Sequence, residues 1–279
     1  MRLLEGKPIA TRIKEELKKR IEGLKLNPVL VSVQAGENAG AEAYARSQKK
    51  TAENLGIEYR FLKLSQDTKE QELIDVIDKL NTDKSVNGII LQMPLPAHID
   101  YKRMSNFILP QKDVEGMHPA NMGKIAFGQA KILPCTPAAV MELLKETGID
   151  LYGKEAVIVG HSEIVGKPLA LLLVEKFATV TICHIGTSQA GKLEEHVRRA
   201  QVLIVAVGKA GLIKGEWIRQ EAVVIDVGIN RVGDKITGDV EFDEASKRAA
   251  WITPVPGGVG PLTVTMLMHN LVEAASLQQ

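Results

Sequence analysis

The sequence predicts an α/β protein built on parallel sheets. Short apolar runs rich in β-branched residues alternate with helical patterns along the chain, as is typical of strands covered by helices on both faces. Three of these runs, all in the second half, end at a glycine: Gly160, Gly208 and Gly228. The chain has 279 residues, which suits one large or two ordinary domains.

The first half is expected to form one α/β domain. Residues 8–24 carry apolar side chains at helical spacing, and a proline closely follows that helix. Beyond it we expect strands over 29–33, 58–64 and 88–92, a loop over 36–40, and helices over 41–55 and 68–80. Gly56 is predicted at the C′ position of the helix before it, and Thr68 or Asp67 as the cap of the next helix.

The second half is expected to form a doubly covered parallel sheet. Its strands are predicted over 156–159, 179–183, 202–207 and 223–227, and its helices over 169–177, 192–200, 216–219 and 262–275. Ligands of such sheets bind outside the carboxyl ends of the strands, which is where the three glycines fall. The pattern therefore favours a nucleotide site at that edge.

The turn within residues 153–168 is the strongest local signal for a phosphate. A buried strand feeds a helix through Gly160 and Gly166, so backbone N–H groups gather at a helix N-terminus. The usual Gly-x-Gly-x-x-Gly pattern is incomplete, because Ser162 and Val165 stand where two of its glycines would be. Taken alone, a structural α/β turn would explain this segment equally well.

Composition excludes several classes of protein. The 35 basic residues nearly cancel the 34 acidic ones, so neither a nucleic-acid-binding nor a membrane-binding surface is expected. Cys135 and Cys183 lack metal or redox spacing, so no metal and a reduced, cytoplasmic location are expected. Charged residues interrupt the N-terminus where a signal-peptide core would form, and no run approaches ~18 apolar residues.

Four features could carry chemistry, and each has a plainer interpretation. Tyr44 and Gln48 form an i, i+4 pair that could equally be a solvated helix face. Gln92, before a Pro-x-Pro turn at a strand end, could simply cap that turn. The acidic loop at 112–116 could be solvated, and the glycine- and proline-rich loop at 254–261 is either a connector or a ligand wall.

The motifs in their order identify a family resemblance. They are residues 92–96 (QMPLP), 112–116 (KDVEG), 134–137 (PCTP), 160–168 (GHSEIVGKP), 224–230 (VIDVGIN) and 254–261 (PVPGGVGP). The chain resembles, end to end, the methylenetetrahydrofolate dehydrogenase/methenyltetrahydrofolate cyclohydrolase family. The resemblance implies a folate domain over residues 1–118 joined by the C-terminal helix at 262–279, a Rossmann-type NAD(P) domain over 119–261, and a cleft between them.

The resemblance also implies an activity and a set of site residues. The dehydrogenase transfers a hydride from 5,10-methylenetetrahydrofolate to a nicotinamide, and the cyclohydrolase opens the methenyl product to 10-formyltetrahydrofolate, within one-carbon metabolism and purine biosynthesis. A homodimer is expected. The implied catalytic residues are Tyr44, Gln48, Gln92 and Asp113. The implied substrate contacts are Tyr44, Gln92, Pro94, Leu95, Pro256, Gly257, Gly258, Val259 and Gly260; the implied cofactor contacts are Gly160, His161, Ser162, Ile164, Val165, Gly166, Ile185, Gly208 and Ile229.

Gln48 stands where the family carries a lysine. Lys49 is adjacent, but one helical step turns it ~100° away from Tyr44. A glutamine cannot exchange protons as a lysine of lowered pKa can. Hydride loss depends on positioning and on the lone pair of the neighbouring folate nitrogen. We therefore expect the dehydrogenase to survive and the cyclohydrolase to be weak or absent; the alternative is a fully bifunctional enzyme.

The cofactor is NADP or NAD. His161, Ile185 and Gly186 replace the arginine and the Ser-Arg pair that typically hold the 2′-phosphate of NADP, although protonated His161 or His184 would partly compensate. No acidic residue near His184 is available for a free ribose 2′-hydroxyl. Two other classes stay open: another two-domain dehydrogenase acting on shikimate or an amino acid, and a non-catalytic folate- or nucleotide-binding regulator.

Overall fold

The structure is a computed structural model, and it describes residues 1–24 and 27–279. The chain forms two compact units. The six-stranded unit comprises Met1–Thr11 and Thr136–Thr263. The three-stranded unit comprises Arg12–Cys135 and Val264–Gln279. The two-domain α/β architecture with parallel sheets is as predicted. The expected domain bounds at 118/119 stay a prediction.

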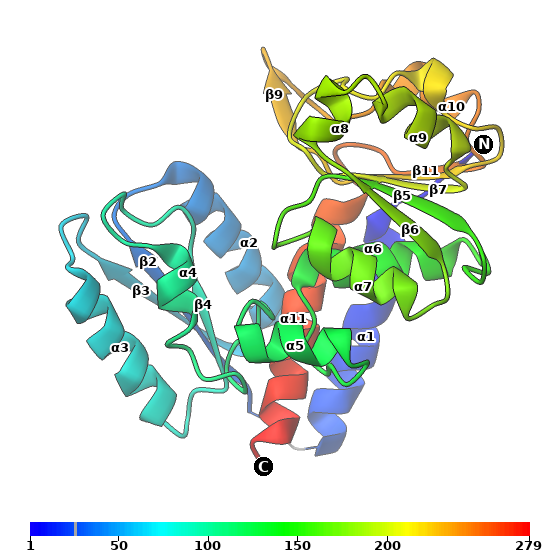
Figure 1. Cartoon of the computed structure of the whole chain (residues 1–279). Helices are drawn as coiled ribbons and strands as arrows, with labels where there is room; N and C mark the ends of the chain where they lie inside the picture. Colours follow the sequence, from blue (N-terminus) through cyan, green and yellow to red (C-terminus); the bar gives the residue numbers. More distant parts are fainter. Residues whose placement is uncertain (25–26) are drawn as a thin grey trace. The chain divides into compact units, whose positions relative to one another are not determined.

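The three-stranded unit is a β-α-β-α-β arrangement (Figure 1). Its strands lie in the order β3-β2-β4 and are all parallel: β2 (Val29–Ala35), β3 (Glu58–Leu64) and β4 (Gly88–Leu91). Helices α2 (Ala39–Asn54) and α3 (Glu70–Thr82) make the crossovers. Val29, Val31 and Val33 pack against α3, so the intervening Ser32 and Gln34 belong to the opposite face.

Two helix ends in this unit test the sequence rules. Helix α2 ends at Leu55 with Gly56 at φ +74°, which confirms the predicted C′ glycine. Helix α3 is capped by Lys69, so the predicted Thr68 or Asp67 cap was wrong. The Thr68 N–H closes a turn on the Ser65 carbonyl, and the Glu72 side chain accepts from the Lys69 N–H, so the first helical turn starts later.

The six-stranded unit is a Rossmann-type sheet. Its strands lie in the order β1-β11-β8-β7-β5-β6 and are all parallel. They span β1 (Arg2–Leu3), β5 (Glu155–Val159), β6 (Thr179–Cys183), β7 (Val202–Val205), β8 (Val223–Asp226) and β11 (Trp251–Ile252). The chain leaves β5 for β6 on one side and returns to β7 on the other, so a topological switch point lies between β5 and β7.

Helices cover both faces of this sheet. Figure 1 shows α6 (Cys135–Glu146) and α7 (Gly166–Val174) on one face and α8 (Ile185–Gln189), α9 (Leu193–Arg199) and α10 (Phe242–Ser246) on the other. A continuous apolar core joins the strands to α9 and α10. The other elements are α1 (Gly6–Leu24), α4 (Tyr101–Ser105), α5 (Pro119–Ala126), η1 (Gly215–Trp217), β9 (Asn230–Val232), β10 (Lys235–Thr237) and α11 (Val259–Leu277).

Several expected boundaries were wrong. The helix expected from 169 begins at Gly166, and the strand expected to 207 ends at Val205, because the next residues turn away to bond a side chain. The short helix expected over 216–219 is a single 3₁₀ turn, and α2 begins inside the loop expected over 36–40. Within the described residues, no helix is long and apolar enough to cross a membrane.

Candidate functional site

A buried polar cluster lies on the three-stranded unit and includes two of the predicted catalytic residues. Gln92 follows β4, Gln48 lies on α2, and both are at most 2% exposed. The Gln92 Nε2 donates to Gln48 Oε1 at 2.8 Å and to Ser32 Oγ at 2.9 Å. The Tyr59 hydroxyl donates to the same Gln48 oxygen at 3.0 Å. Gln48 is therefore held as an acceptor by two donors.

The other end of the Gln48 amide is unused. Among the described residues, its buried Nε2 makes no hydrogen bond, although the amide lies close enough to the Tyr44 hydroxyl to oppose the rise in the pKa of that group. A buried donor left unpaired costs ~1–3 kcal/mol, and such groups in native proteins call for an explanation. A ligand oxygen at this position would remove that cost. The amide thus marks a place for a hydrogen-bond acceptor.

Tyr44 stands beside this amide at the open side of the cluster. It is 37% exposed, whereas Gln48 is fully buried. Its pKa is raised well above the ordinary value, first because the hydroxyl lies among protein atoms and then because Cys135 and Glu115, once ionised at high pH, add negative charge nearby. The Gln48 amide opposes the shift. Tyr44 is therefore a neutral hydroxyl at neutral pH, able to donate a hydrogen bond.

Lys49 does not join the cluster. Its ammonium lies 3.8 Å from Glu53 and its side chain is 56% exposed. The helical rotation that separates it from Tyr44 is as expected. The side chain one helical turn after Tyr44 on the same face of α2 is therefore the neutral Gln48.

Asp113 is buried, so the plainer interpretation of its acidic loop as solvated does not hold at this residue. Asp113 is 4% exposed. Its Oδ2 accepts from the His118 N–H at 2.7 Å and from Asn121 Nδ2 at 2.9 Å. These contacts shape the turn that begins α5. Its assignment as the catalytic carboxylate stays a prediction.

Glu115 is a candidate that the sequence reasoning missed. Its Oε2 accepts from the Tyr101 hydroxyl at 3.3 Å, and its charge reaches Tyr44 and Cys135. Burial, followed by the nearby Asp113 carboxylate, raises the pKa of Glu115 to about 8. The sequence did carry a signal for this residue. The segment 112–116 is an irregular loop, so strand alternation does not decide whether Asp113 or Glu115 faces the site. Both acidic residues of the loop, Asp113 and Glu115, are therefore candidates for the site.

The remaining residues that were expected to contact the folate differ in how exposed they are. Pro94 is exposed, while Leu95 packs against the apolar core under the β4 turn. Near the start of α11, Gly258 N–H bonds the Pro254 carbonyl, and a side chain on Gly6 would collide with the Gly258 carbonyl. Pro256 and Gly260 are exposed, whereas Gly258 and Val259 are buried, and Gly257 is half-buried with its carbonyl accepting from the Gly6 N–H. Exposed backbone in this loop is open to a ligand.

The turn from β5 into α7 needs both of its glycines. Gly160 has φ +126°, and a Cβ there would collide with the Ala206 carbonyl; a Cβ on Gly166 would collide with the Gly160 carbonyl. Ser162 Oγ accepts from the Val165 N–H at 3.1 Å, which folds the turn. Val165 provides no side-chain cap to α7, but the Lys167 N–H bonds the Ser162 carbonyl at 3.0 Å and Pro168 has no N–H. Of the first helical amides, the one at Gly166 is left for an anion.

The residues at the neighbouring strand ends surround this turn. The rings of His161 and His184, which follow β5 and β6, lie 5.3 Å apart. His184 Nδ1 accepts from the Gly186 N–H at 3.1 Å, so the neutral ring carries its proton on Nε2. Ile164, Ile185 and Ile229 are each more than half exposed, and Gly208 has φ +66°. Exposed apolar side chains at strand ends are suited to nucleotide rings.

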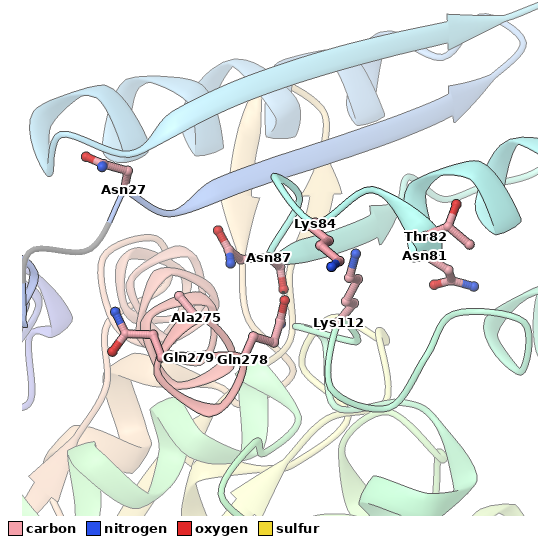
Figure 2. A pocket seen from close by; sticks show the side chains of 9 residues that line it. All are labelled: Asn27, Asn81, Thr82, Lys84, Asn87, Lys112, Ala275, Gln278 and Gln279. Atoms are coloured by element: carbon pink, nitrogen blue, oxygen red, sulfur yellow. Dashed lines mark hydrogen bonds between the residues drawn. The ribbon is translucent and has the colours of Figure 1, made fainter.

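A separate pocket of about 460 Å³ lies at the other end of the three-stranded sheet (Figure 2). Its walls include Asn27 and Asn87, which precede β2 and β4, and Gln278 near the end of α11. The ammonium of Lys112 donates to the Leu80 and Asp83 carbonyls there. None of the predicted site residues lines this pocket. In the described part of the chain, no His, Cys, Asp and Glu group is arranged to hold a metal ion.

The fold and these sites define a class: a protein with a Rossmann-type nucleotide-binding sheet and a second α/β unit that carries a buried polar cluster. Two family models match, the tetrahydrofolate dehydrogenase/cyclohydrolase catalytic domain over residues 4–115 and its NAD(P)-binding domain over residues 134–279. The chain belongs to the tetrahydrofolate dehydrogenase/cyclohydrolase family.

Similar proteins span the whole chain. The bifunctional protein FolD of Acetivibrio thermocellus is 50% identical, with 99% of this chain and 98% of that protein covered. The crystal structure of the bifunctional FolD enzyme of Campylobacter jejuni has TM-score 0.97 and 43% identity, with 100% of both chains covered. The Trypanosoma brucei FolD complexed with NADP and inhibitor has TM-score 0.94 and 35% identity, covering 99% and 98%. The NAD-dependent dehydrogenase of Saccharomyces cerevisiae has TM-score 0.79 and 25% identity, covering 96% and 95%.

Proposed function

We propose that the protein oxidises 5,10-methylenetetrahydrofolate to 5,10-methenyltetrahydrofolate by hydride transfer to NAD(P). The observation that carries the proposal is the buried Gln48 amide whose Nε2 has no protein partner among the described residues. It faces a cluster with Tyr44 and Gln92 in a chain of the tetrahydrofolate dehydrogenase/cyclohydrolase family. The glycine turn from β5 into α7, with the Gly166 amide at the helix start, supports a nucleotide phosphate site on the other unit.

The residues would act mainly by positioning. Gln92 holds Gln48, and the free Nε2 of Gln48 and the hydroxyl of Tyr44 would bind polar atoms of the folate. The lone pair of the neighbouring folate nitrogen drives hydride loss, so no base is required at that step. The nicotinamide supplies the hydride acceptor when it is bound. Asp113 would act by shaping the loop that carries Glu115.

We propose that methenyl hydrolysis is weak or absent. Removing a positioned acid or base typically costs ~10²–10⁴-fold, and Gln48 cannot titrate. Lys49 pairs with Glu53 on the exposed side of α2 and offers no substitute. One observation favours the alternative of a fully bifunctional enzyme: Glu115 is a half-buried carboxyl with a pKa of about 8, which could exchange protons near neutral pH. The relatives named bifunctional agree with that alternative.

We propose that NAD is used at least comparably to NADP. No guanidinium stands at the positions of His161, Ile185 and Gly186, and His184 uses its Nδ1 to cap α8. A charge-assisted phosphate contact contributes ~1.5–3 kcal/mol, so its loss removes much of the preference for a 2′-phosphate.

A homodimer formed through β3 is part of the proposal. β3 is an edge strand of its sheet, and its Phe61 is 42% exposed. Unpaired edges with exposed apolar side chains are suited to pairing with a second chain. Size-exclusion chromatography with light scattering would test it: Phe61→Lys should yield monomer, and an unchanged dimer would exclude this edge.

The activity is tested by following reduced nicotinamide after mixing the enzyme with methylenetetrahydrofolate and either NAD or NADP. Turnover with at least one nucleotide is expected. A protein that binds a nucleotide but gives no turnover with either would be a regulator. A second measurement follows the decay of methenyltetrahydrofolate beyond its spontaneous rate, and fast decay would favour the bifunctional alternative.

A further inference from the structure

Asp239, just after the β9–β10 hairpin, has a carboxylate that is fully buried and fully used. Its Oδ2 accepts from the N–H groups of Val207 at 2.7 Å and Gly208 at 3.0 Å. Its Oδ1 accepts from the Lys209 N–H at 2.7 Å and from Asn230 Nδ2 at 2.8 Å. One side chain thus receives four donors, three of them consecutive amides of the loop that follows β7. Such a run of amides around a carboxylate is an anion nest.

The nest holds the loop in a shape that the strand alone would not give. β7 ends at Val205, and Gly208 then takes φ +66°. Three charge-assisted hydrogen bonds fix the turn at this point, and each is stronger than a neutral one. Because Asp239 occupies these amides, they are unavailable to a phosphate. A nucleotide phosphate would therefore have to bind other amides, such as that of Gly166 at the start of α7.

Asp239 also ties this loop to the one that follows β8. Asn230 donates from the same Nδ2 group to Asp239 and to the Thr237 carbonyl at 3.4 Å. Asn230 is the neighbour of Ile229, which is 68% exposed. The two loops carry Gly208 and Ile229, both expected to contact the cofactor. A single carboxylate therefore sets the spacing between two expected nucleotide contacts.

A second buried carboxylate fixes Asp239 itself. Asp226, at the end of β8, accepts from the Asp239 N–H at 3.0 Å and the Val240 N–H at 2.8 Å. Two glycines make room for the pair. A Cβ on Gly228 would collide with the Asp239 carboxylate, and a Cβ on Gly238 would collide with that of Asp226. The arrangement is over-determined, as expected where a precise backbone shape is needed.

We infer that Asp239 is a positioning residue for the dinucleotide, because its carboxylate sets the shape and spacing of the loops after β7 and β8. The inference rests on the proposed use of NAD(P). Asp239 touches neither substrate nor the reacting atoms, and it acts through Val207–Lys209 and Asn230. Its removal should therefore weaken the use of the nucleotide and leave the use of the folate unchanged.

The test compares Asp239→Asn and Asn230→Ala with Asp234→Asn, a matched control on the same hairpin whose side chain is fully exposed. The measurements are KM for NAD and NADP, KM for methylenetetrahydrofolate, kcat, and the thermal midpoint with and without saturating nucleotide. Asp239→Asn replaces one acceptor oxygen by a donor that faces N–H groups, so nucleotide KM should rise at least about tenfold. Folate KM should stay within about twofold, and Asn230→Ala should give a smaller rise in nucleotide KM.

Several outcomes would contradict the inference. Nucleotide KM within about twofold of wild type in Asp239→Asn would overturn it, and so would a parallel rise in folate KM, which indicates general damage. If Asp239→Asn does not fold, Asn230→Ala decides by the same split between the two KM values. A wild-type protein whose thermal midpoint does not respond to either nucleotide would overturn the proposed function and this inference with it. A wild-type response retained in full by Asp239→Asn overturns the inference alone.

Discussion

Gln48→Lys is the most informative substitution in the three-stranded unit. In the wild-type protein, the Gln48 side-chain oxygen accepts hydrogen bonds from Gln92 Nε2 and from the Tyr59 hydroxyl. A lysine ammonium can only donate, so both partners would have to reverse. Gln92 can do so by turning its amide over, because the Ser32 hydroxyl can donate as well as accept. Tyr59 can likewise accept. The cluster can therefore hold a lysine without losing its hydrogen bonds.

The expected gain is in hydrolysis and the expected loss is in stability. A buried ammonium loses its hydration at a cost of several kcal/mol. The thermal midpoint should fall. Burial also lowers the pKa of such a lysine, which makes it an acid or base near neutral pH. Enzyme-dependent hydrolysis of methenyltetrahydrofolate should rise ~10²–10⁴-fold over wild type.

The assay is the decay of methenyltetrahydrofolate beyond its spontaneous rate, with Lys49→Ala as the control. Lys49→Ala should leave both activities unchanged, because that side chain is exposed and pairs with Glu53. Strong hydrolysis by wild type that Lys49→Ala abolishes would refute the reasoning from the α2 face. A folded Gln48→Lys protein with no gain in hydrolysis would show that a proton carrier is not what the site lacks.

Four further outcomes are expected. Glu115 has a folded pKa of about 8 against an ordinary 4.5, so a folded chain keeps a proton that an unfolded chain releases; the free energy of unfolding should fall by up to ~1.4 kcal/mol per pH unit between these values, and Glu115→Gln should abolish that slope in denaturant titrations. Gln92→Ala should lower dehydrogenase turnover and, because Gln92 is buried, cost ~1–3 kcal/mol in chemical denaturation; normal turnover would show that its role is misassigned. Asp113→Ala should do the same through the loss of the His118 and Asn121 contacts, and unchanged kinetics would remove Asp113 from the site. His161→Arg should raise kcat/KM for NADP relative to NAD by about ten- to a hundredfold, whereas a wild type that already favours NADP by more than about a hundredfold would mean that other residues bind the 2′-phosphate.

Most of the fold was predictable because strand and helix periodicity is a local property. The strands Glu58–Leu64 and Thr179–Cys183 match their predicted bounds, since each is a β-branched or aromatic run bounded by turns. The two-residue strands β1 and β11 were not predicted, because two residues carry no periodicity and depend on pairing with β8 and with each other. The β9–β10 hairpin was missed for the same reason of length.

The site was less predictable than the fold. Tyr44 and Gln48 could be paired by helical spacing, but nothing local showed that the Gln48 oxygen would be taken and its nitrogen left free. The acidic loop itself pointed to Glu115, but the contacts with Tyr101 and Cys135 that set its environment depend on the tertiary fold. Asp239 was invisible to local patterns, since its carboxylate bonds amides about 30 residues earlier.

The most direct measurement follows reduced nicotinamide and methenyltetrahydrofolate together during one reaction of wild-type enzyme with methylenetetrahydrofolate and saturating NAD. Reduced nicotinamide should appear, and methenyltetrahydrofolate should accumulate in equal amount, because the proposal gives Gln48 a positioning role in hydride transfer and no proton to exchange in hydrolysis. Absence of reduced nicotinamide with NAD and with NADP would contradict the proposed dehydrogenase. Reduced nicotinamide without accumulation of methenyltetrahydrofolate, and with 10-formyltetrahydrofolate in its place, would contradict the proposed loss of the second activity.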